Sequence, residues 1–213
     1  VYGDFFGLDD VKTEDPQVVA GMIEVFKDWI TEYNIDGYRV DTVKHVNIEF
    51  WQQWAPAIKE HAASLGRDDF FIFGEVFDGA PRNLSYYTTQ GQLPSVLDFG
   101  LYYQLQSFFA NNAGIGGLQW AFDNDDLYTD GDSNVNTLMN FAGNHDTGRI
   151  GNFIQTNHGT APEAEKLARA KLANAFLFFA RGIPVIYYGD EQGFTGDGDS
   201  DDSREDMMPS TTP

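Results

Sequence analysis

The feature that most constrains the fold is an alternation of helical and extended segments along the chain. Apolar residues recur at three- and four-residue steps over residues 15–34, which predicts an amphipathic helix, and a short β-branched run follows at 35–43. Apolar strands separated by helices are typical of a parallel sheet with helices on both faces, so we expect an α/β fold. The further elements expected are helices at 47–65, near 101–110 and at 163–181, and strands at 70–76, 95–99, 137–142 and 183–189.

Capping residues and prolines mark several of these boundaries. Asp15 is a suitable N-cap for the first helix, and Pro16 suits its first turn. Pro56 lies inside the second helix and should kink it or restart it. Gly182 should end the last helix. Because no low-complexity linker divides the chain, we expect a single domain over residues 1–213.

Charge and composition exclude several classes of protein. The chain has 13 Lys and Arg against 33 Asp and Glu, a net charge of −20. Phosphate backbones and anionic membrane surfaces are bound through Lys and Arg, so we expect neither a nucleic-acid nor a membrane partner. With no cysteine, the chain has no disulfide, thiol nucleophile or Cys-ligated metal. It begins with Val1 and without a signal-peptide pattern, so we expect its start to be internal.

An acidic loop near the C-terminus resembles the start of an EF-hand calcium loop. Asp197, Asp199 and Asp201 have the required spacing. However, Asp202 stands where the sharp turn needs glycine, and Met208 stands where the bidentate glutamate belongs. We therefore do not expect calcium to bind there.

Three predicted strands end in an acidic residue, namely Asp41, Glu75 and Asp146. In parallel α/β folds the reacting groups gather at the carboxyl ends of the strands, so three acids far apart in sequence should converge there. Each acid taken alone fits a helix N-cap or a solvated loop residue better than a catalytic role.

Neighbouring side chains favour a catalytic role for these acids. Arg39 lies two positions before Asp41 on a strand, so both point to one face and the cation should keep Asp41 ionised. Phe71, Phe73 and Glu75 also share a face, and a carboxyl above aromatic rings should stay protonated. One charged carboxylate and one protonated carboxyl are what a retaining glycosidase uses as nucleophile and acid.

Longer segments around these acids resemble the strand-end motifs of the alpha-amylase family, glycoside hydrolase family 13. The segments are GYRVDTVKH at 37–45, FGEVFD at 73–78 and FAGNHD at 141–146, in the family's order. Residues 8–16 are similar to the segment before the family's third barrel helix, and 182–192 to its eighth strand. The resemblance covers nearly the whole chain and implies part of a TIM (β/α)8 barrel, from about the fourth to the eighth strand.

The resemblance implies a role for each residue of the site. Asp41 would be the nucleophile, Glu75 the acid/base and Asp146 the carboxylate that stabilises the distorted sugar, with Arg39 orienting Asp41. His145 would bind sugar hydroxyls in the central subsite.

The same resemblance implies further binding residues. Lys44 and His45 would line the leaving-group side, and this pair resembles alpha-amylases more than many sister specificities. A structural Ca²⁺ would use the Asp10 carboxylate and the main-chain carbonyl of His45, since calcium prefers hard oxygen ligands. Arg39 and Asn144 occupy two positions that hold chloride in chloride-activated members, with no third ligand identified.

The sequence departs from the family in two respects. It lacks counterparts of the first three strands and of most of the inserted domain, so we expect a fragment of a longer enzyme, inactive if it is the whole molecule. Gly143 stands where an acidic or larger residue usually precedes Asn-His-Asp, which affects the expected subsite contacts.

The expected activity is retaining hydrolysis of α-1,4-glucosidic bonds in starch, glycogen or maltodextrin. The alternatives are cyclodextrin or pullulan cleavage, glucan transglycosylation, and a non-catalytic amylase-like protein. The family resemblance further implies an α-glucan as partner, a secreted enzyme and a monomer.

Overall fold

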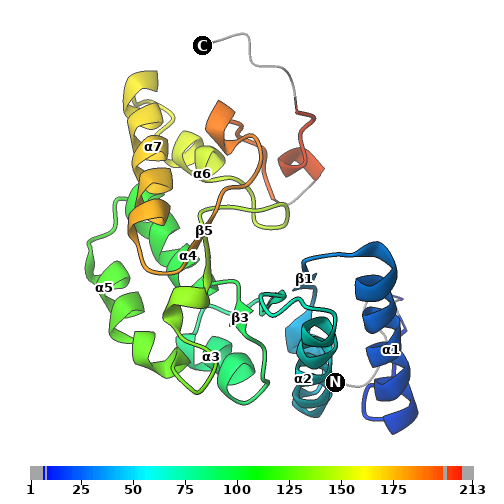
Figure 1. Cartoon of the computed structure of the whole chain (residues 1–213). Coiled ribbons are helices and arrows are strands. Elements are labelled where there is room, and N and C mark those ends of the chain that lie inside the picture. Colours follow the sequence, from blue (N-terminus) through cyan, green and yellow to red (C-terminus); the bar gives the residue numbers. More distant parts are fainter. Residues whose placement is uncertain (1–6, 8, 199–200, 208–213) are drawn as a thin grey trace. The chain divides into compact units, whose positions relative to one another are not determined.

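The computed structural model describes residues 7, 9–198 and 201–207 (Figure 1). Within them the chain forms two compact units. The first contains the chain up to Asp78 with 82–97 and 128–134, and the second contains 79–81, 98–127 and the chain from Val135 onward. Of the positions discussed above, Val1, Leu8, Asp199 and Met208 lie outside the described residues, as does the side chain of Asp201.

The first unit begins with the predicted amphipathic helix, α1 (Pro16–Tyr33). Asp15 caps it as expected, because its carboxylate accepts a hydrogen bond from the amide of Gln17 at 2.9 Å. Asn34 ends the helix in the left-handed conformation with φ 56°, and its amide bonds to the carbonyl of Ile30. The chain then turns directly into the first strand.

Three short parallel strands form the sheet of the first unit. They are β1 (Gly37–Val40), β2 (Phe71–Gly74) and β3 (Ser95–Val96), in the spatial order β1-β2-β3. Val40 pairs with Gly74, and Gly74 pairs with Val96, so the carboxyl ends of the strands lie at one level. Residues that follow these strands therefore emerge at the same edge of the sheet.

Helix α2 (Ile48–Ser64) packs with α1 and the sheet around aromatic side chains. Trp54 is fully buried, and its ring centroid lies 5.0 Å from that of Phe26 and 5.9 Å from that of Tyr38. Pro56 lies within this one continuous helix, so the expectation that proline restarts the helix was wrong. Helix α3 (Pro81–Thr89) follows β2 and was not predicted.

The second unit contains four helices and two parallel strands among its described residues. Met139 pairs with Ile183, which joins the strands β4 (Met139–Phe141) and β5 (Ile183–Val185). Helix α4 begins at Phe99 because Asp98 caps it, accepting from the amide of Leu101 at 2.8 Å. The predicted strand at 95–99 therefore ends early. The helices are α4 (Phe99–Leu105), which continues as a π-helical segment at Gln106–Ala110, α5 (Gly116–Asp123), α6 (Ile150–Asn157) and α7 (Glu163–Phe179).

The core of the second unit is formed by side chains from these helices and from the ends of its strands. Ala142, Ile150 and Leu177 belong to one buried cluster with residues of α4 and α5. Arg181, just after α7, binds the carboxylates of Asp98 and Asp125 at 2.6 and 2.8 Å. The two ion pairs connect the entry to β5 with the start of α4 and with the turn after α5.

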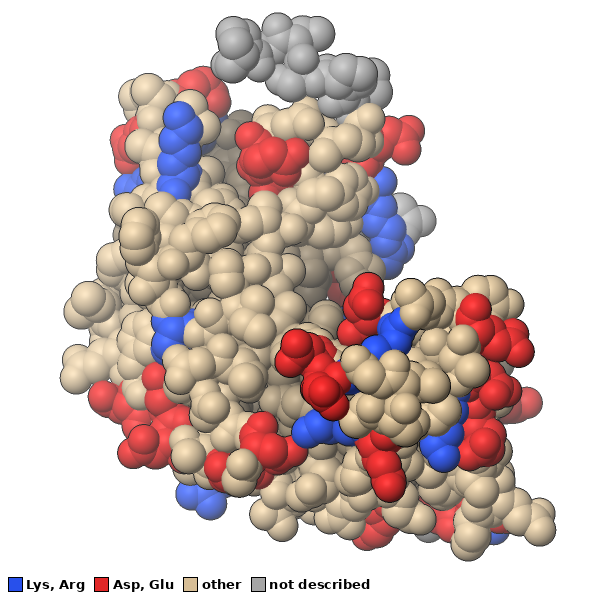
Figure 2. Space-filling model, viewed as in Figure 1, with Lys and Arg blue, Asp and Glu red and all other residues tan. Residues whose placement is uncertain are grey.

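All five predicted strands are present and parallel, and the mixed α/β class is confirmed. They form a three-stranded and a two-stranded sheet in the described part of the chain. None of the described helices is both long and apolar enough to cross a membrane. Figure 2 shows acidic side chains scattered over the visible face with far fewer basic ones, as the net charge of −20 requires.

Candidate active site

Asp41 and Glu75 follow neighbouring parallel strands at matching positions. Because Val40 pairs with Gly74, the next residue of each strand lies at the same level of the sheet. The amide of Glu75 donates to the carbonyl of Val40 at 2.8 Å, and the amide of Val43 donates to the carbonyl of Glu75 at 3.0 Å. The structure thus brings these two predicted site residues together by main-chain hydrogen bonds.

Arg39 contacts both acids. One terminal nitrogen of its guanidinium binds Oδ1 of Asp41, and the other lies 3.1 Å from Oε1 of Glu75. The expectation that Arg39 and Asp41 share a face is confirmed. The contact with Glu75 was not predicted, because the sequence does not show that the strands before Asp41 and Glu75 pair with each other.

The two acids lie in different environments. The Asp41 side chain is 63% exposed, whereas that of Glu75 is 8% exposed. The expected burial of Glu75 is thus present, and Asp41 is open to solvent. A carboxylate accessible to a ligand beside a buried carboxyl is an arrangement suited to nucleophile and acid.

The backbone between the acids adopts a rare conformation. Thr42 has φ 50° and ψ 33°, in the left-handed region that β-branched residues seldom occupy. In this conformation its amide donates to Oε2 of Glu75 at 3.3 Å. Such strain is characteristic of functional sites, where the surrounding structure imposes it.

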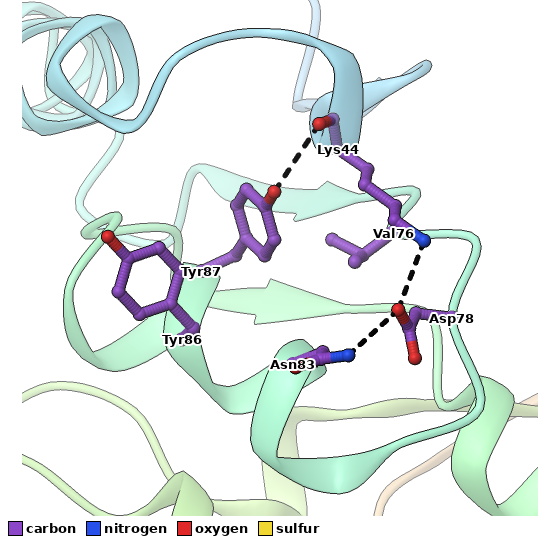
Figure 3. A pocket seen from close by; sticks show the side chains of 6 residues that line it. All are labelled: Lys44, Val76, Asp78, Asn83, Tyr86 and Tyr87. Carbon is purple, nitrogen blue, oxygen red and sulfur yellow. Dashed lines mark hydrogen bonds and ion pairs between the residues drawn. The ribbon is translucent and has the colours of Figure 1, made fainter.

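Lys44 lines a pocket of about 150 Å³ beside these acids in the first unit. Its ammonium binds Asp78 at 3.0 Å and the carbonyl of Phe77 at 3.2 Å, and Asn83 donates to the same carboxylate (Figure 3). The hydroxyl of Tyr87 donates to the carbonyl of Lys44. Burial raises the pKa of Tyr87, so its hydroxyl stays a neutral donor.

A larger cavity of about 500 Å³ in the first unit is lined in part by Asp41. Asp10, Arg39 and Asp41 form part of its polar lining. His45, which is exposed, ends the short 3-10 turn Val43–His45 that follows Asp41 in the sequence. The remaining walls of the cavity are mostly apolar and include the aromatic side chains of Phe26, Phe50, Trp51 and Trp54.

Asp10 and His45 do not make a calcium site by themselves. They supply one carboxylate and one main-chain oxygen, whereas Ca²⁺ takes six to eight oxygen ligands. Over the residues that the structure describes, no group of three or more His, Asp or Glu side chains is placed to hold a metal ion. We therefore assign no step of the chemistry to calcium.

Asp146 lies in the second unit, in a tight turn after β4. Asn144 shapes this turn, because its side-chain oxygen accepts from the amides of Asp146 and Thr147 at 2.9 and 2.8 Å. The main chains of Asn144 and Gly148 exchange two hydrogen bonds of 3.1 Å across it. The turn therefore fixes the backbone that carries the third predicted acid.

The carboxylate of Asp146 lies between two cationic or potentially cationic groups. Nε2 of His145 is 3.1 Å from one oxygen, and a guanidinium nitrogen of Arg204 is 3.3 Å from the other. His145 was expected at the site from its motif, but Arg204, 58 residues after Asp146 in an acidic loop, was not.

The comparison with known protein families shows which family the chain belongs to. The model of the alpha-amylase catalytic domain matches residues 1–211. The chain belongs to the alpha-amylase family.

Individual alpha-amylases are similar over nearly the whole chain. An alpha-amylase of Streptomyces lividans is 47% identical over 211 residues, which are 99% of this chain and 23% of that protein. The beta/alpha-amylase of Paenibacillus polymyxa is 34% identical over 96% of the chain and 16% of its own length. The alpha-amylase of Geobacillus thermoleovorans, solved in complex with acarbose, superposes with a TM-score of 0.83 at 34% identity, covering 96% of this chain and 43% of that one. The chain thus spans less than half of each of these relatives.

Close packing of the backbone explains why position 143 is a glycine. A Cβ atom at Gly143 would lie 2.5 Å from the carbonyl oxygen of Gly148 and 3.0 Å from Cα of Arg149. The turn that carries Asp146 closes too tightly for a larger residue at position 143.

The two candidate chloride ligands are engaged in other contacts. Arg39 binds Asp41 and Glu75, and the side-chain oxygen of Asn144 accepts from its own turn. Both residues therefore have structural roles that do not require an anion.

Proposed function

We propose that this alpha-amylase family chain belongs to a retaining glycoside hydrolase that cleaves α-1,4-glucosidic bonds in starch, glycogen or maltodextrin. The observation that carries the proposal is the pairing of Asp41 and Glu75, which follow neighbouring parallel strands and share one guanidinium. Retention requires two carboxyl groups about 5–5.5 Å apart. A common cationic partner is consistent with that separation.

In the first step, an oxygen of the Asp41 carboxylate attacks the anomeric carbon of the sugar. Glu75 gives its proton to the glycosidic oxygen, which leaves with the bonding electron pair. Arg39 orients Asp41 and stabilises its charge before the attack. The products of this step are a glycosyl ester of Asp41 and a free glucan chain.

In the second step, Glu75 acts as a base. It removes a proton from water, the water oxygen attacks the anomeric carbon, and Asp41 leaves as a carboxylate. Asp146 would stabilise the positive charge that develops on the sugar in both steps, and His145 would bind its hydroxyls. Two successive inversions give a product of retained configuration.

Lys44 and His45 would bind sugar units on the leaving-group side. The Lys44 ammonium is held by Asp78 at the edge of a pocket, so its remaining hydrogen-bond capacity can reach a hydroxyl. Cleavage of cyclodextrin or pullulan, or transfer to another sugar, would use the same acids, and product chromatography separates these reactions.

We further propose that residues 1–213 are part of one (β/α)8 catalytic domain and that the protein is secreted as a monomer. The family resemblance carries this proposal, and an enzyme that uses starch supplied outside the cell must be exported to reach it. The protein should therefore be found in the culture medium of its source, at its monomer mass in gel filtration.

The test of the reaction is the anomeric form of the first product. Proton NMR at early times should show the α-anomer released from maltodextrin, before mutarotation. Early release of the β-anomer would overturn the proposal, because it would require inversion.

A matched pair of variants assigns the acid. Glu75→Gln should lower kcat by about 10²–10⁴-fold with substrate binding retained. Glu60→Gln, at an exposed position of α2 in the same unit, should leave kcat unchanged. Unchanged kcat in Glu75→Gln would exclude Glu75 as the acid.

A further inference from the structure

A buried arginine lies immediately after the turn that carries Asp146. Arg149 is fully buried, and three of its nitrogens bind protein atoms. Nη1 donates to the carbonyl of Tyr188 at 2.7 Å and to Asp190 at 2.8 Å, Nη2 donates to the carbonyl of Ser203 at 3.1 Å, and Nε binds Glu205. The guanidinium also lies against aromatic rings, 4.2 Å from the ring centroid of Tyr187 and 5.3 Å from that of Phe194.

The acceptors of Arg149 come from two segments distant in sequence. Tyr188 and Asp190 follow β5, whereas Ser203 and Glu205 lie in the C-terminal segment that we call the strap, residues 195–198 and 201–205. The hydroxyl of Tyr188 also donates to the carbonyl of Glu205 at 2.7 Å. Arg149 thus joins the strap to the loop after β5.

The strap contacts the Asp146 turn at several points. Ser203, which is fully buried, donates from its hydroxyl to the carbonyl of His145 at 2.9 Å. The Arg204 guanidinium reaches Asp146 at 3.3 Å. A Cβ atom at Gly198 would lie 2.3 Å from the amide of Gly148, so only a glycine brings the strap this close to the turn.

From these contacts we propose that Arg149 is a positioning residue for the third carboxylate. By holding Ser203 and Glu205, it fixes the strap against residues 144–148 and places Arg204 on Asp146. The proposal rests on the proposed function in one respect, namely the role given to Asp146.

Arginine is the side chain that this arrangement needs. Its planar fork donates to four acceptors in different directions while its face packs on aromatic rings. A lysine has three donors on a single atom and cannot reach both the loop after β5 and the strap in this geometry. The substitution Arg149→Lys therefore keeps the charge and removes the positioning.

Hydrogen exchange of the full chain tests the positioning directly. In Arg149→Lys, the amides of Thr147 and Gly148 should exchange about tenfold faster, because the strap no longer covers the turn. Arg181→Lys is the matched control, since Arg181 is a largely buried arginine of the same unit that pairs with two carboxylates away from this turn. It should leave exchange in the turn within about twofold of wild type.

Glu205→Gln is the milder variant, because the Glu205 side chain is 31% exposed and Arg149 keeps its other acceptors. It should accelerate exchange at Thr147 and Gly148 in the same direction. If Arg149→Lys unfolds globally, protection is lost throughout α7 as well, and Glu205→Gln then decides. Unchanged exchange in the turn of a folded variant, or equal acceleration in Arg181→Lys, would overturn the proposal.

Kinetics of the native protein provide the second readout. A misplaced Asp146 should lower kcat about 100-fold in Arg149→Lys while KM stays within about threefold, since positioning affects the transition state rather than ground-state binding. A rise in KM at constant kcat would overturn the proposal. If wild type cleaves no α-glucan, the proposed function fails, but the exchange result still decides whether Arg149 positions the turn.

Discussion

The guanidinium of Arg39 lies 3.1 Å from the carboxylate of Glu75, the residue that follows the neighbouring strand. The same guanidinium binds Asp41 on its own strand. One guanidinium therefore contacts both acids, one of them exposed and one buried. This arrangement holds the two side chains at the same edge of the sheet.

Removing that cation should affect both stability and activity. In Arg39→Ala, the largely buried Glu75 loses its ionic partner, which should cost about 1–3 kcal/mol in the free energy of unfolding. The loss of orientation at Asp41 should lower kcat/KM by about 100-fold. Urea unfolding and kinetics on maltodextrin measure the two effects.

Lys27→Ala is the control for Arg39→Ala, because Lys27 pairs with the exposed Glu24 on α1. It should change stability by no more than about 0.5 kcal/mol and leave activity unchanged. Equal effects of the two substitutions would contradict the role of Arg39.

Lys44 should act in binding rather than in chemistry. Its ammonium lies at the edge of the small pocket, where its hydrogen-bond partners are the Asp78 carboxylate and the carbonyl of Phe77 rather than Asp41 or Glu75. Lys44→Ala should raise KM about tenfold, corresponding to about 1.4 kcal/mol, with kcat unchanged. Lys59→Ala removes an exposed pair with Asp132 in the same unit and should change neither constant. A fall in kcat without a change in KM for Lys44→Ala would contradict this assignment.

Helix boundaries and strand ends were predictable from local signals. Asp15 and Pro16 marked the start of α1, and the acids at 41 and 75 marked the ends of β1 and β2. These signals depend on the residue itself and its near neighbours. The family assignment also followed from local motifs, because they surround the strand ends.

Other features depend on contacts between distant residues. The short helices α3, α5 and α6 lack a long periodic pattern, and packing in their unit determines them. The contacts of Arg204 with Asp146 and of Arg149 with Glu205 join residues 58 and 56 positions apart. No sequence pattern indicates which cation reaches which acid, so these partners became evident only in the structure.

The turn before Asp146 should not tolerate a side chain at Gly143. In Gly143→Ala the Cβ atom would lie 2.5 Å from a main-chain oxygen, so the backbone must move, at a cost of about 1–3 kcal/mol. Thermal unfolding measures this effect. Gly114→Ala, where no atom lies within 4 Å of the added carbon, should not destabilise the chain. A neutral Gly143→Ala would show that the turn is less tightly closed.

Stability should depend on the protonation of Asp190. Burial raises the pKa of Asp190 from 3.8 to about 6, the Arg149 guanidinium opposes this rise, and Glu191 and Glu205 add to it. The folded chain therefore takes up a proton near pH 6 and the unfolded chain near pH 4. This contribution to stability is fully present below pH 4 and is lost as pH rises through about 6.

Comparison with Asp190→Asn isolates that contribution. Between pH 7 and pH 5, the stability of wild type relative to the variant should increase by about 1 kcal/mol. Urea unfolding at the two pH values gives this difference, and other titrating groups cancel between the two proteins. A relative stability that decreases toward pH 5 would contradict the raised pKa of Asp190.

The central claim is that Asp41 forms a covalent bond to the sugar while Glu75 provides acid and base. An α-maltosyl fluoride needs no acid to leave, so Glu75→Gln should be glycosylated by it and then hydrolyse slowly for lack of a base. Mass spectrometry of that variant should show the protein heavier by one maltosyl group, and peptide mapping should place the group on Asp41. An adduct on another residue, or turnover by the wild type with no adduct on the variant, would contradict the account.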